Sequence, residues 1–145
     1  MIKVIDFVKK KATFHSSTTY DETTAQFKMP IYQSKTPGVY FILYGNDIMK
    51  VGKADGRNGL KGRLNDYRAK NVIRIPNDPT AKLFHDIMTT KLKGKVLDFY
   101  VYEIPMLETL LEGYTIHMSR ARSFEIALSK QANEEGHSML LSSQN

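Results

Sequence analysis

The chain has 145 residues, of which 41% are hydrophobic and 25% charged, and these proportions predict a compact globular protein. It has no cysteine, which excludes a disulfide scaffold, a thiolate zinc site and a cysteine nucleophile. No apolar run approaches the ~20 residues that span a membrane, and residues 1–13 do not resemble a secretory signal, so we expect a cytoplasmic protein without membrane contact. The 21 Lys and Arg against 15 Asp and Glu give a net charge of +6. This balance favours an anionic partner, most commonly nucleic acid, over a merely basic solvated surface.

The first 35 residues differ in character from the rest. Residues 2–12 have the spacing of a short amphipathic helix, and residues 15–28 are mostly polar, which predicts a loop or irregular arm. Pro37 and Gly38 then mark the start of a different region. We therefore divide the chain into an N-terminal helix and polar arm, 1–35, and a main domain, 36–145.

A β-hairpin begins the main domain. Residues 38–44 are rich in β-branched and aromatic side chains, residues 45–47 have turn chemistry, and residues 48–51 form a second short apolar run. Such a pattern predicts two strands joined by a tight turn. A glycine-rich loop follows at residues 52–59.

Helices and one more strand complete the domain. The apolar spacing predicts helices over 60–70 and 80–92, a strand over 96–102 and a helical stretch over 105–133 with a break near Gly113. The order hairpin, helix, helix, strand, helix predicts an α/β fold with a three-stranded, largely antiparallel sheet flanked by helices.

One carboxylate stands out in the last predicted helix. Positions 107, 111, 114, 118, 121, 125, 128 and 132 follow helical steps along one face, and Glu125 is the one acidic residue among otherwise apolar or small side chains. A carboxylate in such a stripe must be paired, hydrogen-bonded or bound to a cation. The structural alternative is a glutamate at the edge of the core that pairs with an arginine.

Positive charge is concentrated after the predicted hairpin. Arg63 and Tyr67 lie four residues apart and share a helix face, which suits recognition of a phosphate group. The alternative is a solvated positive surface. The cluster comprises Lys50, Lys53, Arg57, Lys61, Arg63, Arg68 and Lys70.

Taken in order, these motifs resemble the GIY-YIG nucleases. Gly38-Val39-Tyr40 corresponds to the first motif of that family, and Lys50-Val51-Gly52-Lys53 to the second, with lysine in place of its tyrosine. Lysine at this place is similar to a variant found in some restriction enzymes of the family. From Gly38 onward the chain is most similar to the family's small phage endonucleases. The resemblance implies the fold predicted above and hydrolysis of DNA phosphodiester bonds.

The resemblance also implies a role for each candidate catalytic residue. Tyr40 would act as the base or orient the attacking water, and Lys50 would assist it. A lysine does this near neutral pH only where neighbouring positive charge, here Arg63 and the metal ion, lowers its pKa. Arg63 would hold the scissile phosphate, and Tyr67 would bond the nucleophile or the phosphate. Glu125 would be the sole protein ligand of Mg²⁺ (or Mn²⁺), an ion that usually keeps most of its water ligands.

These residues predict a metal-dependent endonuclease acting on double-stranded DNA, either a restriction enzyme or a phage enzyme that degrades DNA, in a bacterial or phage-infected cell. Lys53, Arg57, Lys61 and Arg68 would attract DNA without regard to sequence. Asn133 and Asn145 are both candidates for a late asparagine of the family. A non-cleaving DNA-binding module of the same fold, and a basic structural protein, are the alternatives. Cutting two strands with one site suggests a homo-oligomer, a dimer or tetramer, or successive nicking.

Overall fold

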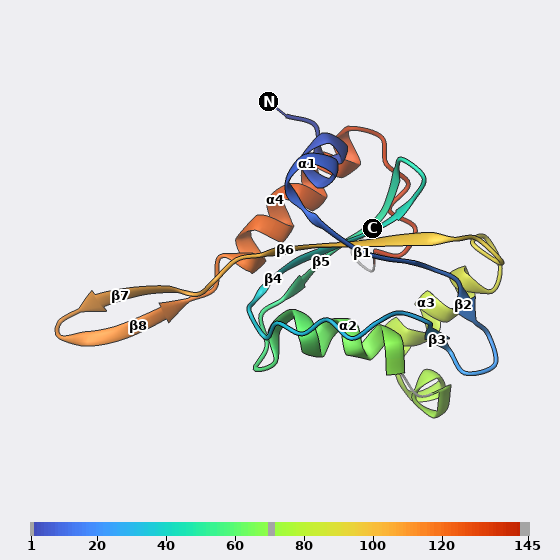
Figure 1. The fold of residues 1–145 in the computed structure, drawn as a ribbon, viewed down its shortest axis with the longest axis horizontal. Coiled ribbons are helices and arrows are strands. Elements are labelled where there is room, and N and C mark those ends of the chain that lie inside the picture. The colour runs from blue at the N-terminus through green and yellow to red at the C-terminus, as the bar shows by residue number, and fades with distance from the viewer. Residues whose placement is uncertain (1, 70–71, 143–145) are drawn as a thin grey trace.

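The computed structural model describes residues 2–69 and 72–142 and consists of an antiparallel sheet with helices on both faces (Figure 1). Four strands form the sheet in the order β1-β6-β4-β5. Helices α1 and α4 cover one face, and α2 and α3 cover the other. The bounds are α1 Val4–Lys11, β1 Thr13–Thr18, β4 Gly38–Tyr44, β5 Asp47–Ala54, α2 Gly59–Ala69, α3 Pro79–Met88, β6 Leu97–Glu103 and α4 Ala121–Glu134. A 3₁₀ turn, Val72–Asn77, precedes α3.

The central strand β4 explains why helices cover both faces of the sheet. Residues 38–43 of β4 are all buried, and alternate side chains of a strand point to opposite faces. Tyr40 and Ile42 belong to the core beneath α2 and α3, whereas Val39, Phe41 and Leu43 belong to the core beneath α1 and α4. The predicted β4–β5 hairpin is therefore confirmed, as are the helices at α1, α2 and α3 and the strand at β6.

Both glycines of the two hairpin motifs are required by close contacts. A Cβ atom on Gly38 would overlap the carbonyl oxygen of Tyr102 on the neighbouring strand. Gly52 lies opposite Tyr40 in the β4–β5 register, and a Cβ atom there would overlap the Tyr40 ring. The absence of a side chain at Gly52 thus lets the Tyr40 ring lie across β5.

The sheet has four strands, so the prediction of three was wrong. The polar loop predicted over 15–28 includes most of β1, which pairs with β6, and a small ribbon of β2 (Tyr20–Asp21) and β3 (Gln26–Phe27). β1 is an edge strand rich in serine and threonine, a composition that hides it from a search for apolar alternation. One of its inward side chains makes a hydrogen bond in place of an apolar contact: Thr18 Oγ1 donates to the Lys28 carbonyl at 2.6 Å.

The long helix predicted over 105–133 was also wrong in its first half. Residues 107–118 form a hairpin, β7 (Leu107–Leu111) and β8 (Tyr114–Met118), which projects from the body of the protein (Figure 1). Its turn residues Glu112 and Gly113 have φ of 51° and 82°, a left-handed conformation that ends any helix. The second half of the stripe is confirmed, because Ala121, Glu125, Leu128 and Ala132 are the buried residues of α4.

The chain after α4 returns to the outer edge of β5. The Met139 amide donates to the Ile48 carbonyl at 3.0 Å, and the Leu141 amide to the Met49 carbonyl at 2.9 Å. The side chains of Met139 and Leu141 are buried, one in each half of the core. This C-terminal segment, residues 137–142, therefore covers the start of β5 without forming a strand of the sheet.

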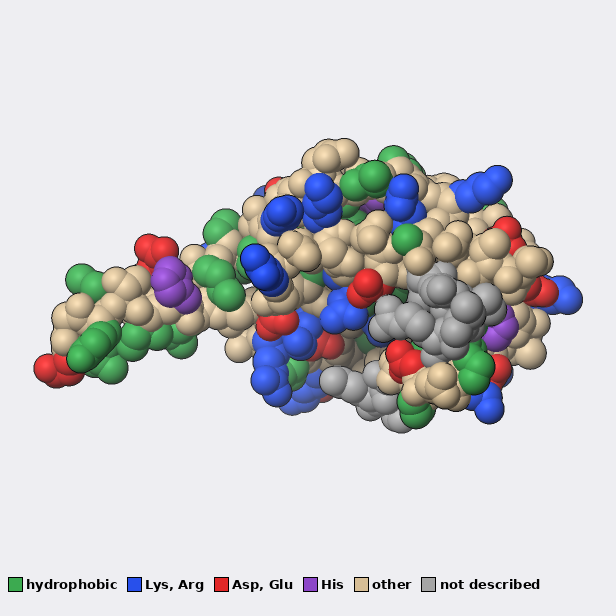
Figure 2. All heavy atoms as spheres, turned by 90° about the horizontal axis from the view of Figure 1, so that it is seen from below, with side chains coloured by type: hydrophobic (Ala, Val, Ile, Leu, Met, Phe, Trp, Pro, Cys, Tyr) green, Lys and Arg blue, Asp and Glu red, His purple; other side chains and the backbone are tan. Residues whose placement is uncertain are grey.

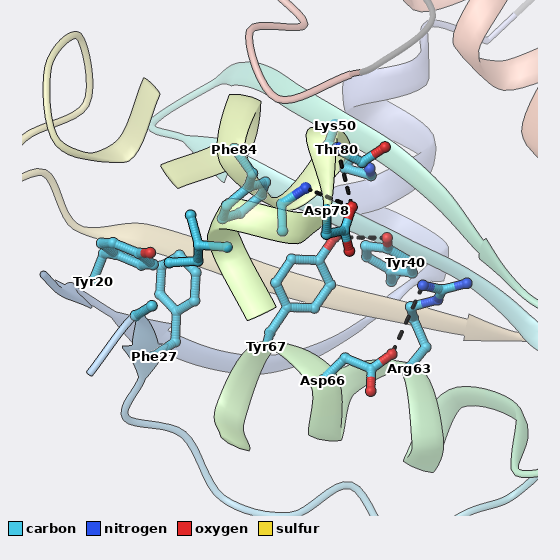
Figure 3. Close-up of a pocket in the computed structure, with 13 residues that line it drawn as sticks. Tyr20, Phe27, Tyr40, Lys50, Arg63, Asp66, Tyr67, Asp78, Thr80 and Phe84 are labelled. Atoms are coloured by element: carbon cyan, nitrogen blue, oxygen red, sulfur yellow. Dashed lines mark hydrogen bonds and ion pairs between the residues drawn. The ribbon is translucent and has the colours of Figure 1, made fainter. Parts of the chain in front are cut away.

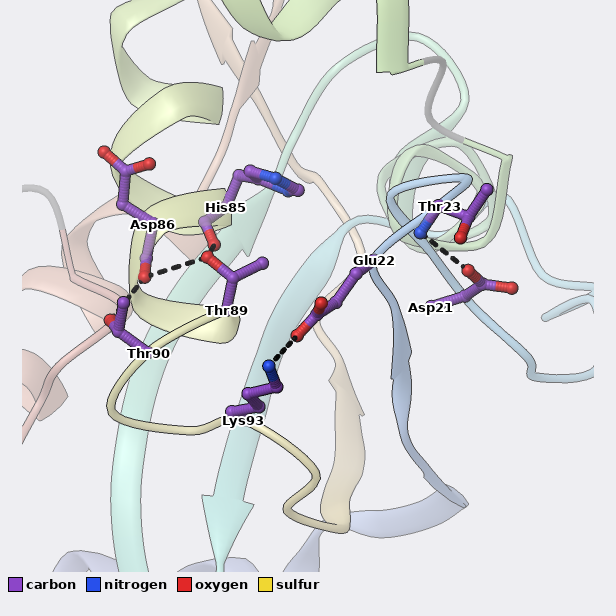
Figure 4. A network of polar contacts seen from close by, with 8 residues as sticks. All are labelled: Asp21, Glu22, Thr23, His85, Asp86, Thr89, Thr90 and Lys93. Atoms are coloured by element: carbon purple, nitrogen blue, oxygen red, sulfur yellow. Dashed lines mark hydrogen bonds and ion pairs between the residues drawn. The ribbon is translucent and has the colours of Figure 1, made fainter.

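The β2–β3 ribbon packs beside α3 and the turn that follows it (Figure 4). The hydroxyl of Tyr20 shares a hydrogen bond of 2.5 Å with His85 Nδ1, and Lys93 Nζ lies 3.9 Å from Glu22 Oε1. These contacts hold α3 against the ribbon. Within residues 2–69 and 72–142, no helix has the length and apolar character needed to cross a membrane.

Candidate active site

The predicted catalytic residues line two adjoining cavities at the edge of the sheet. The smaller, of about 240 Å³, is lined by Tyr40, Lys50, Lys53, Arg63 and Glu125 among others. The larger cavity, of about 290 Å³, is also lined by Tyr40, Lys50, Arg63 and Thr80 (Figure 3). Tyr67 lines only this larger cavity. The structure therefore brings together the five residues that the motifs singled out, although they are spread over residues 40–125 of the chain.

The edge position of β5 makes this convergence possible. Tyr40 comes from β4, Lys50 and Lys53 from β5, Arg63 and Tyr67 from α2, and Glu125 from α4. α2 packs on one face of the sheet and α4 on the other. Because β5 is the outermost strand of the sheet in the described part of the chain, side chains from both helical layers reach the same hollow around its edge.

Tyr40, which is buried, and Tyr67, which is partly buried, form a hydrogen-bonded pair. Their hydroxyl oxygens are 2.7 Å apart, and their ring centroids 5.5 Å apart. Burial raises the pKa of Tyr40, although its bond to Tyr67 and the charge of Arg63 oppose the shift. Burial, together with Tyr40, raises the pKa of Tyr67 well above its ordinary value. Both hydroxyls are thus protonated near neutral pH, which suits Tyr40 to orient a water molecule rather than to take its proton.

Glu125 is a buried carboxylate, only 8% exposed, in a site with several cations. Burial raises the pKa of Glu125, and the positive charges of Lys53 and Lys50 partly offset this effect. A hydrogen bond with Ser129 and the charge of Arg122 have smaller effects in the same direction. The lysines at the cavity, more than an arginine, are therefore the cations that favour the ionised form.

Arg63 lines both cavities and is half-exposed. Its side chain is 47% exposed, and Nη1 lies 3.8 Å from Asp66 Oδ2, three residues further along α2. An exposed pair at this distance is weak, so the guanidinium is available to an incoming anion. Its planar fork of donors suits two oxygens of one phosphate group.

The residues predicted to attract DNA do not all lie at the cavities. Lys53 does, and its Nζ donates to Asp55 Oδ1 at 3.0 Å. Arg57 is exposed in the turn before α2, and Lys61 is partly exposed on that helix. Arg68 donates to Asn65 at 3.3 Å and lines a separate hollow beside β2 and β3.

Figure 2 shows Lys and Arg side chains gathered on the body of the protein near the base of the β7–β8 hairpin. The hairpin itself, residues 107–118, has none. Lys70 and Asn145 lie outside the described residues. Asn133 is exposed and donates to the Ser129 carbonyl at 3.0 Å.

The structure adds residues that the motifs did not indicate. Asp66, Asp78 and Thr80 line the larger cavity. Asp78 precedes Pro79 and caps α3, accepting from the amides of Thr80 and Ala81, a helix start that its sequence pattern indicates. The aromatic lining of this cavity could not be predicted, because Tyr20 and Phe27 belong to the segment interpreted as a polar loop.

The donor set fits one hard divalent cation with few protein ligands. Among the described residues no group of three or more His, Asp and Glu side chains is placed to hold a metal ion. Mg²⁺ often binds through one or two carboxylates together with waters and substrate phosphate oxygens, and Glu125 is the one carboxylate among the residues that line the smaller cavity.

The fold is thus a small antiparallel α/β domain with its candidate site at an edge strand. No protein-family model and no curated protein matches the chain. Among solved structures, a glutamate-to-alanine mutant of bacteriophage T4 EndoII matches with a TM-score of 0.64 and 19% identity, over 91% of this chain and 96% of that one. The restriction endonuclease HPY188I in complex with product DNA matches with a TM-score of 0.49 and 14% identity, over 94% and 88%. The chain therefore shares the fold of EndoII over almost its whole length.

Proposed function

We propose that this protein is a metal-dependent DNA endonuclease of the GIY-YIG type. The observation that carries the proposal is the convergence of Tyr40, Lys50, Arg63, Tyr67 and Glu125 on two adjoining cavities. The fold shared with EndoII, a phage endonuclease, supports it. The net charge of +6 favours DNA as the substrate.

Hydrolysis of a phosphodiester needs an oriented water, a proton acceptor and positive charge on the phosphoryl oxygens. Arg63, half-exposed where it lines both cavities, binds the scissile phosphate. Tyr40, kept protonated by burial and held by Tyr67, orients the attacking water. The amine of Lys50 then accepts the proton of that water. We assign the roles in this way because burial raises the pKa of Tyr40, which favours its protonated hydroxyl.

Glu125 would hold Mg²⁺ or Mn²⁺, which when bound stabilises negative charge on the leaving oxygen. The carboxylate is suited to this because the positive charge of Lys53 favours its ionised form. Lys53 contacts a neighbouring backbone phosphate, and Arg57 and Lys61 add attraction that does not depend on sequence. The products are a 5′-phosphate and a 3′-hydroxyl, as for the family the chain resembles, and the reaction takes place in the cytoplasm.

Cleavage of supercoiled plasmid with Mg²⁺, compared with retention of the same DNA in a gel, tests the function. We expect nicked and linear products from the native protein, and none in EDTA. If the protein retains DNA without cutting it under varied metals, it is the binding module considered above, and Lys50 in place of the family's tyrosine is the first suspect. If it does neither, it is a basic structural protein.

Replacement of Arg63 separates phosphate recognition from general attraction. For Arg63→Ala we expect a cleavage rate about 10²–10³-fold lower, the scale of losing one donor to transition-state charge. Arg63→Lys should restore little of the cleavage rate, because an ammonium group lacks the planar pair of donors of the guanidinium group. Arg68→Ala on the same helix is the control and should lower DNA affinity only slightly. Equal losses for Arg63→Ala and Arg68→Ala would contradict the assignment.

We further propose that the protein is a homo-oligomer held by the β7–β8 hairpin. The pairing register of β7 and β8 places five large apolar side chains and Thr109 on one face of this hairpin. The apolar residues are Leu107, Leu111, Tyr114, Ile116 and Met118, of which all but Ile116 are exposed. A two-stranded hairpin with an uncovered apolar face is marginally stable alone. Without Lys or Arg at residues 107–118, a DNA backbone is a poor partner for it.

Sedimentation of the native protein and of Leu111→Glu tests this contact. We expect a dimer or tetramer for the native chain, and a lighter species at the same concentration for the variant. Glu112→Gln, at the turn, is the control and should sediment as the native protein does. A native monomer at micromolar concentration would refute the oligomer.

A further inference from the structure

The geometry points to the larger cavity as a binding site for one nucleobase, taken out of the DNA helix beside the scissile phosphate. This inference rests on the proposed function, because it assigns the substrate group that sits next to the reacting phosphate. It adds a second binding element to the site. One nucleotide of the substrate then spans both cavities.

Aromatic side chains make up much of the lining of this cavity (Figure 3). Tyr20, Phe27, Tyr67 and Phe84 come from β2, β3, α2 and α3. They pack edge to face or tilted, with ring centroids 5.4 Å apart for Tyr67 and Phe84 and 6.1 Å for Phe27 and Phe84. Aromatic faces are the platforms on which proteins stack unpaired bases.

A shared wall links this cavity to the candidate catalytic one. Tyr40, Lys50, Arg63 and Thr80 line both cavities, whereas Glu125 lines the smaller and the aromatic cluster the larger. A phosphate held by Arg63 therefore has Glu125, the proposed metal ligand, in one cavity and the aromatic cluster in the other. The base of the nucleotide that carries this phosphate is the group within reach of the aromatic side.

The polar lining favours bases that donate hydrogen bonds. Asp66 and Asp78 both line the cavity, and ionised carboxylates only accept. Asp78 Oδ1 accepts from the Thr80 and Ala81 amides at 3.1 Å each, which fixes the orientation of this carboxylate at the start of α3. The exocyclic amino groups of adenine, cytosine and guanine match such acceptors, whereas thymine has no amino group and offers only its N3–H.

The walls are held in place before any ligand binds. The Tyr20–His85 hydrogen bond ties β2 to α3. The exposed Glu22–Lys93 pair adds a weak contact between the same ribbon and the turn after α3 (Figure 4). Phe27 is only 1% exposed and anchors the cluster in the core. A preformed cavity of this kind loses little conformational entropy on binding.

Binding of deoxynucleoside 5′-monophosphates, measured against deoxyribose 5-phosphate by calorimetry or NMR titration, tests the site without any cleavage. Both probes carry the phosphate, so their affinity ratio reports the base alone. For the native protein we expect dAMP, dCMP and dGMP to bind at least about tenfold more tightly than deoxyribose 5-phosphate, the effect of one stacked base. We expect TMP to show a smaller advantage.

Two variants and one control locate the effect. Ala81→Leu fills the cavity from α3, since Ala81 is buried and lines it, and Phe84→Leu removes a stacking face while keeping an apolar side chain. Each should remove the advantage of the nucleotide and leave deoxyribose 5-phosphate binding unchanged. Leu83→Ala, on the exposed side of the same helix, should change neither. Thermal unfolding of each variant shows whether it is folded.

A duplex with a single mismatch extends the test to DNA. Extrusion of a base costs least where the base is unpaired, so the native protein should bind a mismatched duplex more tightly than a matched one, and Ala81→Leu should not. Equal binding of dAMP and deoxyribose 5-phosphate by the native protein would overturn the base site. Plasmid cleavage by that same protein would show that the proposed function still holds, so the two failures are distinguishable.

Discussion

Glu125→Gln is expected to abolish cleavage and yet to make the folded protein more stable at neutral and alkaline pH. Loss of the carboxylate removes the one protein ligand proposed for the metal ion, so cleavage should fall by about 10²–10³-fold or more. DNA retention should persist, because Arg63 and the lysines remain. Plasmid cleavage and gel retention measure the two effects side by side.

The gain in stability follows from the pKa of Glu125. Burial raises this pKa, so the folded state disfavours the ionised form relative to the unfolded chain. The carboxylate therefore adds stability while protonated, below its unfolded pKa, and loses that contribution as pH rises through its folded pKa. Glutamine keeps the shape of the side chain without its charge. In the absence of metal, the melting temperature of the Glu125→Gln protein should therefore exceed that of the native protein at pH 8, and the difference should shrink toward pH 4.

Glu134→Gln, an exposed position on the same helix, is the control and should change neither cleavage nor the pH dependence of melting. The opposite result, a Glu125→Gln protein less stable than the native one at pH 8, would show that the carboxylate belongs to a structural ion pair. The lysines at the cavity would then be its partners rather than ligands of DNA.

Gly52→Ala is expected to damage both the fold and the site through one contact. The new methyl group would occupy the space of the Tyr40 ring, so the ring or the strand must shift, at a cost of about 1–3 kcal/mol. A shifted ring breaks the 2.7 Å hydrogen bond to Tyr67 and moves the hydroxyl proposed to orient the water. Denaturant unfolding should show the loss of stability, and cleavage should fall further than DNA affinity.

Gly56→Ala is the matched control, because no atom lies within 4 Å of a Cβ built there and its φ is not positive. Tyr40→Leu shortens the side chain that Gly52 accommodates, so Gly52→Ala should cost less in that background than in the native one. Additive losses in the double variant, or equal effects at Gly52 and Gly56, would contradict the steric explanation.

The sequence predicted the parts of the fold where one local signal dominates. The β4–β5 hairpin has two apolar runs around a turn, and α2 and α3 have apolar side chains at helical spacing. The spacing of Glu125 among Ala121, Leu128 and Ala132 is correct because those residues do form one helix. The convergence of the candidate residues could also be predicted, because they follow two motifs. The glycines of these motifs, Gly38 and Gly52, are required by close contacts with neighbouring strands and with the Tyr40 ring.

The errors also have physical causes. Apolar residues at 107, 111, 114 and 118 fit helical steps, but they are equally the cross-strand partners of a hairpin, and only the left-handed Glu112-Gly113 turn separates the two. β1 escaped detection because its side chains are hydroxyls at a sheet edge. The aromatic cavity unites residues far apart in the chain, so it follows from tertiary packing and has no local pattern.

The C-terminal segment that runs along β5 has a consequence for how the protein meets its own copies. Amides at Met139 and Leu141 occupy carbonyls on the outer side of the strand that carries Lys50. An unprotected edge strand invites pairing with another chain and, from there, aggregation. Here the protein itself covers the start of that edge, at Ile48 and Met49, close to where Ser142 lines the cavity. The segment thereby disfavours pairing of this part of β5 with another copy of the chain.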